Sequence, residues 1–480
     1  MKKKIKVFVS GVFNVLHPGH LRLLRYAREI GSELLVGVLS DKIANNAAHV
    51  NENLRLDGVK TNGWVSKALI IRNSIKKEIL KYKPNIVVKG KEHELSFNEE
   101  ESIVKSIGAK LLFSSGEATF SSIDLINKEF KPIADKQIFL SEIFLKRHKI
   151  SKKKLFNTID KLNKLKVCVI GDLIIDEYIS CDALGMSQEE PTLVVTPIDT
   201  KRFVGGAGIV AAHIAGCGAR VNFVSVVGKD QLATYASQSL KTMGVESFLF
   251  EDGRRPTTLK QRFRSSGKSL LRVSTLHQDP ISSKLEKKIF TRLMKILKNT
   301  NILIFSDFNY GCLTNNLINK ITKYCKSNNI LIAADSQSSS QIGDISKFQG
   351  ADLITPTERE ARICTHNHSD ALHILASNLQ KKSNAKNLII KLGSEGVFIR
   401  PYKINHRNSW KEDRIEAMNL FPKDTAGAGD SLLAVTSMAL AAGSNIWESV
   451  FLGSLASAIQ VGSVGNTVIK KKDLLRELEK

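Results

Sequence analysis

The feature that most constrains this chain is a pair of strand-to-helix turns that carry phosphate-binding groups, one in each half. The segment SGVFNVLHPGH (Ser10–His20) follows an apolar run and precedes a helical pattern, and DTAGAGDS (Asp424–Ser431) has the same setting. A helix N-terminus offers unpaired backbone N–H groups and the positive end of a dipole. Each turn is therefore a candidate phosphate site, and two such turns predict two active centres in one polypeptide.

Length and composition favour a globular protein of two or three domains. The chain has 480 residues, of which 42% are hydrophobic and 25% are charged. No apolar run reaches the roughly 18–20 residues of a membrane span. The start, MKKKIKVFVSGVFNVL, lacks a small-residue cleavage site and is better interpreted as a first strand than as a signal peptide. We therefore expect a cytoplasmic protein without membrane insertion.

The net charge of +24 limits which kinds of partner are expected, and the cysteines indicate the compartment. No basic stripe with interleaved aromatic residues accompanies the charge, so we expect no nucleic-acid partner. We interpret the charge as a lysine-rich background combined with a preference for phosphorylated, anionic ligands. The six cysteines form no CxxC pair and no metal-finger spacing, which indicates reduced thiols in a reducing compartment.

Apolar strands alternate with helical patterns in both halves, which predicts two doubly wound α/β domains. In the first domain, residues 1–130, we expect strands at 6–9, 33–39, 86–88 and 110–113 and helices at 20–30, 74–82 and 102–107. Residues 131–165 are rich in lysine and form a predicted basic helical connector. A second α/β domain begins with KVCVIGD and occupies residues 166–480. Ligands are expected at the carboxyl ends of the strands.

Two histidines distinguish the N-terminal turn. His17 and His20 bracket Pro18-Gly19 at the predicted helix start, and Gly19 lets the backbone approach a phosphate closely. Imidazoles three residues apart can both point at one anion and stabilise charge that develops on phosphorus. The alternative is that these are two unrelated surface histidines. The preceding strand and the GVFN segment favour the phosphate site over that alternative.

This stretch resembles the cytidylyltransferase-like nucleotidyltransferases, whose mark is a G-x-F-D-x-x-H-x-G-H pattern, over residues 1–130. The resemblance implies a Rossmann-like fold and attack of a phosphate oxygen on the α-phosphorus of a nucleotide, with release of pyrophosphate. It implies catalytic roles for His17 and His20 and nucleotide or phosphate contacts from Ser10, Gly11, Phe13, Gly19, Arg55, Lys89, Ser121 and Ser122.

Two departures from that family pattern stand out in the N-terminal domain. Asn14 stands where the family usually has an aspartate, which removes a charge near the phosphate site. The segment 42–67 diverges where the family commonly supplies a basic phosphate ligand. Arg55 is our first choice for that ligand and Lys42 the second.

The C-terminal turn combines an anion cradle with a carboxylate. The small residues Ala426–Gly429 leave backbone N–H groups uncovered around a turn. Asp430 then lies on the first helical turn, where its carboxylate could accept a hydroxyl proton while the N–H groups neutralise a transferring phosphoryl group. The alternative interpretation is that Asp430 only caps the helix.

The second domain resembles the ribokinase-like sugar kinases over residues 166–480, with motifs GDLIID, VGGAG, TPTEREA and KLGSEG in the expected order. A closer resemblance is to the kinase domain of the bifunctional ADP-heptose synthases, with a β lid around GMSQEEPTLVV. These resemblances imply Asp430 as the catalytic base; nucleotide contacts from Lys391, Gly393, Thr425, Ala426, Gly427, Ala428 and Gly429; substrate contacts from Asp176, Gly205, Gly206, Lys260, Arg262 and Asp307; and a water-mediated magnesium contact from Glu360.

This domain also departs from its family. Ile209 stands where an asparagine usually follows the glycine pair, and Thr357 replaces the asparagine of the N-x-x-E element. The order of the domains is the reverse of the usual fusion, in which the kinase comes first.

The resemblances together imply an enzyme that activates a sugar phosphate with Mg²⁺ and ATP. The kinase would phosphorylate a heptose phosphate, and the N-terminal domain would make ADP-heptose for lipopolysaccharide core synthesis, with ATP or CTP as its nucleotide. A homodimer through the kinase lid is left open. The alternatives are another sugar or polyol phosphate activated with CTP, or a protein in which one domain is catalytically silent.

Overall fold

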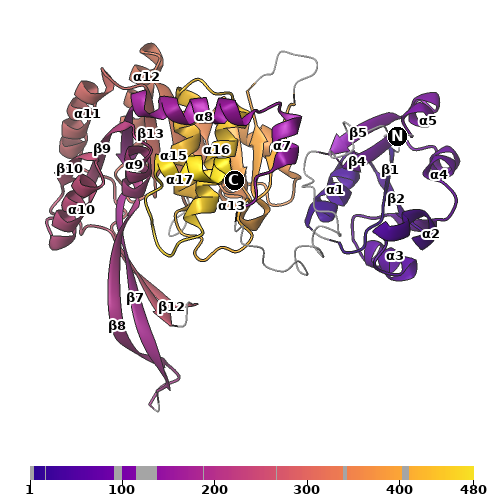
Figure 1. Cartoon of the computed structure of the whole chain (residues 1–480), viewed down its shortest axis with the longest axis horizontal. Helices are drawn as coiled ribbons and strands as arrows, with labels where there is room; N and C mark the ends of the chain where they lie inside the picture. Colours follow the sequence, from indigo (N-terminus) through magenta and orange to yellow (C-terminus); the bar gives the residue numbers. More distant parts are fainter. Residues whose placement is uncertain are drawn as a thin grey trace. The chain divides into compact units, whose positions relative to one another are not determined.

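The computed structural model of the chain describes residues 5–16, 18–90, 100–114, 138–187, 189–265, 268–338, 343–402 and 410–480. Two compact units make up the chain (Figure 1). The first comprises residues 1–135, 367–377 and 410–414, and the second comprises residues 136–366, 378–409 and 415–480. Each unit contains a parallel α/β sheet of its own, as the alternation of strands and helices predicts.

The described part of the first unit is built on a five-stranded parallel sheet with the order β3-β2-β1-β4-β5. Its elements are β1 (Lys6–Gly11), α1 (Pro18–Glu29), β2 (Glu33–Leu39), α2 (Asp41–Ala44), α3 (Glu52–Lys60), β3 (Lys67–Ile71), α4 (Ile75–Tyr82), β4 (Ile86–Gly90), α5 (Glu101–Ser106) and β5 (Lys110–Ser114). Strands β2 and β3 are added on one side of β1, and β4 and β5 are added on its other side. The β1–α1 turn therefore lies at the topological switch point of the sheet.

Both faces of this sheet are buried, because its helices cover both sides. Val7 and Val9 of β1 pack in one apolar cluster, and Phe8 between them packs in the other. This is why β1 has a continuous apolar run and not an alternating one. The doubly wound fold is confirmed, and the predicted elements agree with the observed ones. The sequence analysis missed α2, α3 and β3, of which α2 and α3 lie largely in the divergent segment 42–67 and β3 starts at its end.

The described part of the second unit has a nine-stranded main sheet with the order β10-β9-β6-β13-β14-β15-β16-β17-β18. Its strands are β6 (Lys166–Gly171), β9 (Arg220–Val227), β10 (Glu246–Glu251), β13 (Ile302–Asp307), β14 (Leu331–Ser336), β15 (Leu353–Ile354), β16 (Asn387–Lys391), β17 (Val397–Arg400) and β18 (Asp413–Ile415). Neighbouring strands from β10 to β16 run parallel, and β17 pairs antiparallel with β16. The carboxyl ends of the parallel strands therefore meet at one edge.

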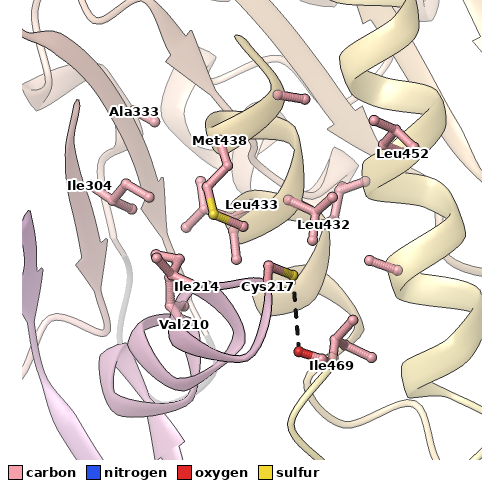
Figure 2. Close-up of a cluster of buried hydrophobic side chains, with 14 of the residues drawn as sticks. Val210, Ile214, Cys217, Ile304, Ala333, Leu432, Leu433, Met438, Leu452 and Ile469 are labelled. Atoms are coloured by element: carbon pink, nitrogen blue, oxygen red, sulfur yellow. Dashed lines mark hydrogen bonds between the residues drawn. The ribbon is translucent and has the colours of Figure 1, made fainter. Parts of the chain in front are cut away.

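Helices cover both faces of the main sheet. They are α9 (Ala207–Gly216), α10 (Gln231–Thr242), α11 (Ser283–Leu297), α12 (Asn315–Ser327), α13 (Glu358–Thr365), α14 (Leu372–Ser383), α15 (Ala428–Ala441), α16 (Ile446–Gln460) and α17 (Lys471–Glu479); only residues 378–383 of α14 belong to the second unit. Figure 2 shows α9 and α15 meeting over the sheet, with Val210 and Ile214 facing Leu433 and Met438. No helix in the described ranges combines the length and the hydropathy that a membrane crossing needs. The six cysteines are free and buried.

A smaller four-stranded sheet forms the predicted β lid, with the order β12-β11-β7-β8. Its strands are β7 (Leu173–Met186), β8 (Leu193–Gly206), β11 (Leu259–Ser265) and β12 (Lys268–Thr275). The β7–β8 hairpin extends far from the main sheet of its unit (Figure 1). Because β7 starts two residues after β6 ends, the lid is joined directly to the centre of the main sheet.

The segment predicted as a connector contributes to the core of the second unit. Its helices α7 (Glu142–Arg147) and α8 (Lys152–Lys161) bury Phe144, Leu155 and Ile159 in the main apolar cluster. The lysines of α8 lie on its other, exposed face. Residues 131–137 lie outside the described residues. The helical and basic character was visible in the sequence, whereas the burial depends on partners such as Phe451.

Candidate functional site

A cavity of about 740 Å³ opens at the carboxyl edge of the second unit's main sheet. The lid strands β7, β11 and β12 form one wall, and the turn before α15 forms another. Most residues predicted for this site line the cavity, namely Asp176, Gly206, Lys260, Arg262, Glu360, Lys391, Gly393, Thr425, Ala426, Gly427, Ala428, Gly429 and Asp430. Residues about 250 positions apart in the sequence are thus brought together.

The segment predicted as an anion cradle leads into the start of α15. Gly427 adopts a left-handed conformation, with φ of 75°, and begins the helix without a side-chain cap. A side-chain carbon at position 427 would lie 2.7 Å from Asn466 Oδ1, so a residue larger than glycine would clash there. The first N–H groups of α15 therefore face the cavity without a capping side chain, as a phosphate site needs.

Asp430 lies in the first turn of α15 and is buried, but it does not cap the helix. Burial and, after it, the neighbouring Asp335 raise the pKa of Asp430 to about 7, although Lys391 opposes the shift. Gln337 Nε2 lies 3.4 Å from Asp430 Oδ1, which is a long contact. A carboxylate with a pKa near neutrality at an uncapped helix start is suited to accept a proton.

Lys391 lies beneath the cradle as a buried cation. Its Nζ donates to both oxygens of Asp335, at 2.8 and 2.9 Å, and lies 3.2 Å from where a side-chain carbon of Gly429 would stand. Burial alone would lower the pKa of Lys391, but the nearby carboxylates, Asp335 and Glu360 foremost, together outweigh burial and the pKa is raised. The ammonium group thus places a fixed positive charge next to the predicted phosphate site.

Asp176 forms the opposite end of the cavity on β7. Its Oδ1 accepts from Arg262, at 3.3 Å, and its Oδ2 accepts from Asn466 Nδ2, at 3.0 Å. Burial raises the pKa of Asp176, and the Arg262 and Lys260 charges partly offset that effect. Gly205 has to be a glycine here, because a side-chain carbon would lie 2.2 Å from Asp176 Oδ2. Gly205 therefore makes room for the carboxylate, whereas Gly206 lines the cavity itself.

Basic side chains gather on the lid wall. Lys260 Nζ lies 5.4 and 5.3 Å from the ring centres of Phe308 and Tyr310, which hold the ammonium group by cation–π attraction. Arg262 pairs with Arg272 across β11 and β12, and both line the cavity. Arg272 was missed in the sequence analysis. Three cations on one wall suit an anionic group such as a phosphate.

Asp307 does not line the cavity, in contrast to its predicted contact with the substrate. Its carboxylate is almost fully buried, accepts from Ser336 Oγ at 2.7 Å and pairs with Lys347 Nζ at 2.6 Å. It also accepts from Asn309 N and so stabilises the turn after β13. The neighbouring Phe308 faces the cavity in its place.

Glu360 and Thr357 form a capping box at the start of α13. Thr357 Oγ1 accepts from Glu360 N, and Glu360 Oε2 accepts from Thr357 N at 2.7 Å. Thr357 therefore caps α13. Glu360 Oε1 accepts from Ser338 N. Both Glu360 oxygens are engaged by N–H groups, which leaves lone pairs for metal-bound water.

The described residues contain no cluster of three or more His, Cys, Asp or Glu side chains that could hold a metal ion directly. Mg²⁺ typically keeps several water ligands and binds through substrate phosphates. The donor set therefore fits a magnesium ion that arrives with a nucleotide and contacts Glu360 through water. Ile209 is fully buried in the apolar core and does not line the cavity, so its replacement of asparagine removes a polar side chain without occupying the cavity.

In the first unit, the β1–α1 turn positions His20 against Phe13. The two rings meet edge to face, with centres 5.0 Å apart, and His20 Nδ1 lies 3.1 Å from Val15 O. That contact favours the proton on Nδ1. Phe13 has a φ of 54°, which is unusual for a residue with a bulky side chain and marks a tight turn. His17 lies outside the described residues.

Asn14 stabilises the turn, with its side chain buried. Its Nδ2 donates to Ala47 O at 2.6 Å, and its Oδ1 accepts from His49 N at 2.9 Å. An aspartate could make the second contact but not the first, because a carboxylate has no N–H group. The departure from the family pattern therefore has a structural reason.

Arg55 does not face a phosphate site, so its predicted role as a phosphate ligand is wrong. Its side chain is fully buried and donates to Val50 O, Val12 O and Leu39 O, at 2.6, 2.6 and 2.8 Å. It also pairs with Asp41, and that hydrogen bond lowers the pKa of Asp41. The guanidinium group therefore joins the ends of β1 and β2. Lys42, the second choice, lies on the short helix α2.

The other predicted residues of the first unit are only partly described. Ser10 and Gly11 end β1, and Gly19 lies in the first turn of α1. Lys89 lies near the end of β4 and pairs with Glu100 at 2.8 Å. Ser121 and Ser122 lie outside the described residues.

The cavity residues of the second unit that sequence reasoning missed include, besides Arg272, Asn466 and Gln337. Asn466 follows Gly465 on the loop between α16 and α17, and Gln337 follows β14. Neither belongs to a motif. The position of Gln337 at a strand end was the only available signal, since ligands gather at that edge of a parallel sheet.

The fold and the cavity define an α/β protein of the carbohydrate-kinase class. Residues 164–472 match the model of the pfkB family carbohydrate kinases, and residues 8–118 match the cytidylyltransferase-like model. The chain therefore belongs to the pfkB family, and it carries a cytidylyltransferase-like domain at its N-terminal side. Both resemblances seen in the sequence are confirmed.

Solved structures share the fold of the second unit. Ribokinase from Arabidopsis thaliana, complexed with ribose and ATP, aligns with 66% of this chain and 99% of its own, with a TM-score of 0.52 and 18% identity. Phosphofructokinase-2 from Escherichia coli, in complex with potassium, aligns with 66% of this chain and 100% of its own, with a TM-score of 0.53 and 15% identity.

Curated relatives carry the name "Bifunctional protein HldE". The protein from Helicobacter hepaticus is 31% identical over 65% of this chain and 63% of its own length. The protein from Geobacter metallireducens is 29% identical over 65% of this chain and 62% of its own length. The matched part of the chain thus spans less than two thirds of these relatives.

Proposed function

We propose that this chain is a cytoplasmic, bifunctional enzyme that activates a sugar phosphate. The second unit phosphorylates a heptose phosphate from MgATP, and the first unit transfers a nucleotidyl group to the sugar 1-phosphate, giving ADP-heptose for lipopolysaccharide core synthesis. The two domain matches and the relatives named HldE support this proposal. The observation that carries it is the buried Asp430, at an uncapped helix start, across the cavity from a cationic lid.

The kinase step follows from the chemistry of these residues. Asp430 accepts the proton of the attacking sugar hydroxyl, whose oxygen bonds to the γ-phosphorus of ATP while ADP leaves. The N–H groups at the start of α15 and the Lys391 ammonium stabilise the charge on the transferring phosphoryl group. Glu360 would hold a magnesium ion through water when the nucleotide is bound, and that ion would supply neutralisation of phosphate charge. Asp176 binds a sugar hydroxyl, and Lys260, Arg262 and Arg272 bind the phosphate that the sugar already carries.

The transferase step requires no covalent enzyme intermediate. The sugar 1-phosphate oxygen attacks the α-phosphorus of the nucleotide, and pyrophosphate leaves. His17 and His20 stabilise the charge on that phosphorus. The kinase product carries one phosphate more than the transferase accepts, so a separate phosphatase acts between the two steps.

A panel assay tests the proposal. The purified protein is incubated with heptose, hexose and polyol phosphates, with ATP and CTP in turn, and both ADP and pyrophosphate are measured. Phosphorylation of a heptose phosphate in wild type, and its loss in Asp430→Asn, is the expected result. Turnover confined to another sugar or polyol, or to CTP, would replace heptose and ATP in the proposal.

A second candidate is a sugar kinase with a catalytically silent first unit. The buried side chains of Arg55 and Asn14 favour this candidate. Both donate hydrogen bonds to backbone carbonyl groups, so neither is available to a nucleotide phosphate. Kinase activity without pyrophosphate release from any sugar 1-phosphate would support this candidate.

We also propose that the lid forms a homodimer. The lid carries exposed apolar side chains on both strands of its long hairpin, at Leu184, Met186, Leu193, Val194 and Ile198. A second copy of the same hairpin could cover them symmetrically. Light scattering of wild type and of Ile198→Asp would show a dimer and a monomer, respectively.

A further inference from the structure

The loop that follows β13 supports a cation of the kinase cavity. Phe308 of this loop lines the cavity, whereas Tyr310 is buried and does not line it. Their ring centres lie 5.4 and 5.3 Å from Lys260 Nζ. The position of the ammonium group in the cavity therefore depends in part on where the loop places the two rings.

Asp172 holds the backbone of this loop. It lies between β6 and β7 and is buried. Its Oδ2 accepts from Phe308 N at 2.8 Å and from Tyr310 N at 3.3 Å. Its Oδ1 accepts from Cys312 N at 3.2 Å. The N–H groups of three alternate residues thus converge on one carboxylate.

The residues between these N–H groups have an unusual backbone conformation. Asn309 and Gly311 have φ values of 61° and 85°, both in the left-handed region. Backbone that turns in this way can form a concavity of N–H groups that binds an anion. Here the anion is the Asp172 side chain. Without it, buried N–H groups would lack an acceptor, so the loop conformation depends on this carboxylate.

Arg255 holds the same loop through a carbonyl group. Its Nη1 donates to Tyr310 O at 2.8 Å, and its Nε pairs with Asp252 at 3.2 Å. The side chain of Arg255 is buried as well. Tyr310 is therefore fixed at both its N–H and its carbonyl group, and its ring is fixed beside Lys260.

The GDLIID motif thus contains two carboxylates that face different groups. Asp176 lines the cavity, while Asp172, four residues earlier, faces the loop after β13. Lys260 on β11 is paired in register with Asp176 on β7. The ammonium group that the loop supports therefore comes from the position beside the cavity carboxylate of the same motif.

We propose that Asp172 is a positioning residue for substrate binding by the kinase. It holds the loop 308–312 in the conformation in which Phe308 and Tyr310 place the Lys260 ammonium group against the phosphate that the acceptor carries. This inference rests on the proposed kinase function and deepens it, because it assigns the placement of a phosphate-binding cation to a carboxylate that touches no substrate.

The test is a double-mutant cycle of Asp172→Asn and Lys260→Met in the full chain. Asparagine keeps the size of the side chain, but its NH₂ group cannot accept a hydrogen bond from the loop. With the sugar phosphate that the panel identifies, Asp172→Asn should raise the KM about 5- to 30-fold and change kcat and the KM for ATP by less than about twofold. In the Lys260→Met background, the same substitution should change the KM by less than about twofold, because no ammonium group is left to misplace.

Tyr310→Leu tests the same link without altering the carboxylate. It removes one ring beside Lys260 and leaves the backbone contacts of position 310 in place. The KM for the sugar phosphate should rise, by less than in Asp172→Asn because Phe308 remains. If Asp172→Asn does not fold, the cycle uses Tyr310→Leu with Lys260→Met, and additive effects in that cycle overturn the inference.

Asp352→Asn is the matched control. Asp352 precedes β15, at the end of the parallel strands opposite to the cavity, and its Oδ2 accepts from Ile332 N at 2.8 Å. The exchange weakens a contact between a carboxylate and the backbone of the second unit without reaching the loop. The KM values for the sugar phosphate and for ATP should stay close to those of wild type. Circular dichroism and melting temperatures of all variants report their folding.

The outcomes separate the inference from the proposed function. If Asp172→Asn raises the KM by the same factor with and without Lys260, or leaves it at the wild-type value, Asp172 does not act through Lys260 and the inference fails. An equal rise in Asp352→Asn would show that the effect is not specific to the loop and would also overturn it. If wild-type protein phosphorylates no sugar phosphate in the panel, the proposed function fails first, and this role fails with it.

Discussion

The two phosphate-site turns have similar sequence patterns, yet they differ in how their polar side chains are used. In the second unit, Asp430 makes only a long contact with Gln337 in the described structure. In the first unit, Arg55 and Asn14 are engaged by backbone groups after β1, at the end of β2 and in the segment between α2 and α3. A motif therefore gives the type of residue, whereas the local packing decides whether that residue remains available to a ligand.

The largest expected effect is that of Asp430→Asn on the kinase. The substitution keeps the shape of the side chain and removes its ability to accept a proton. Phosphoryl transfer should fall by about two to four orders of magnitude, while nucleotide affinity changes little. Steady-state kinetics and ATP titration measure the two quantities. A variant with near-full turnover would mean that Asp430 is not the base.

The same variant has a signature in stability. An aspartate whose pKa is raised by burial contributes stability that is present below its unfolded pKa and is lost as pH rises through about 7. Asp430→Asn lacks that loss, so its gain in melting temperature over wild type should be larger at pH 8 than at pH 5. Equal differences at both values would contradict the raised pKa.

The next effect is that of His20→Ala on nucleotidyl transfer. The imidazole should act on the transition state, since the phosphorus gains charge only during attack, so turnover should fall by about 10²- to 10³-fold with little change in nucleotide binding. Pyrophosphate release measures the transferase, and kinase activity in the same sample is the control. Equal loss of both activities would indicate misfolding or shared chemistry and would break the comparison between two separate centres.

Arg55→Met sharpens the comparison by testing a buried guanidinium in the first unit. The change leaves three backbone oxygens and Asp41 without their donor, so unfolding of that unit should become easier by about 3–5 kcal/mol. Denaturant-dependent hydrogen exchange of first-unit amides in the full chain measures this. Arg72→Met is the matched control, because Arg72 is exposed in its pair with Glu52 and should cost at most about 1 kcal/mol. A stable Arg55→Met protein with weakened nucleotide binding would restore the phosphate-ligand role.

The smallest effect is expected for Asn14→Asp, which introduces the family's residue. A carboxylate cannot donate to Ala47 O, so the first unit should lose about 1–3 kcal/mol. Asn53→Asp, on the exposed side of α3, adds the same charge without a buried partner and should be nearly neutral. If Asn14→Asp leaves stability unchanged and speeds nucleotidyl transfer, Asn14 lowers catalytic activity and is not a structural adaptation.

Much of the fold was predictable, because strands and helices in a doubly wound sheet leave strong periodic patterns. The cradle of the second unit was predictable for a similar reason, since glycine and alanine at a helix start have few other uses. The helix α3 and the strand β3 were missed because they are stabilised by packing against β2, and their own sequences lack a strong periodic pattern.

The wrong predictions share a physical cause. Arg55 and Asp307 carry a charge that could bind a ligand, but both side chains are buried. Each forms its hydrogen bonds and its ion pair with protein groups instead. Asn466 shows the opposite case. Its residue type and loop position give no signal, and only the fold brings it against Asp176 and Gly427. Burial and partners of individual polar groups cannot be read from spacing along the chain.

The pH dependence of phosphoryl transfer tests the central claim most directly, namely that the second unit contains a buried base ready to accept a proton. Because Asp430 has to be ionised to act, and burial raises its pKa to about 7, kcat/KM should rise with pH and level off above neutrality. Below that point, activity should fall about tenfold per pH unit. A profile that stays flat down to pH 5, with its ascending limb near the ordinary carboxyl value of about 4, would contradict the account.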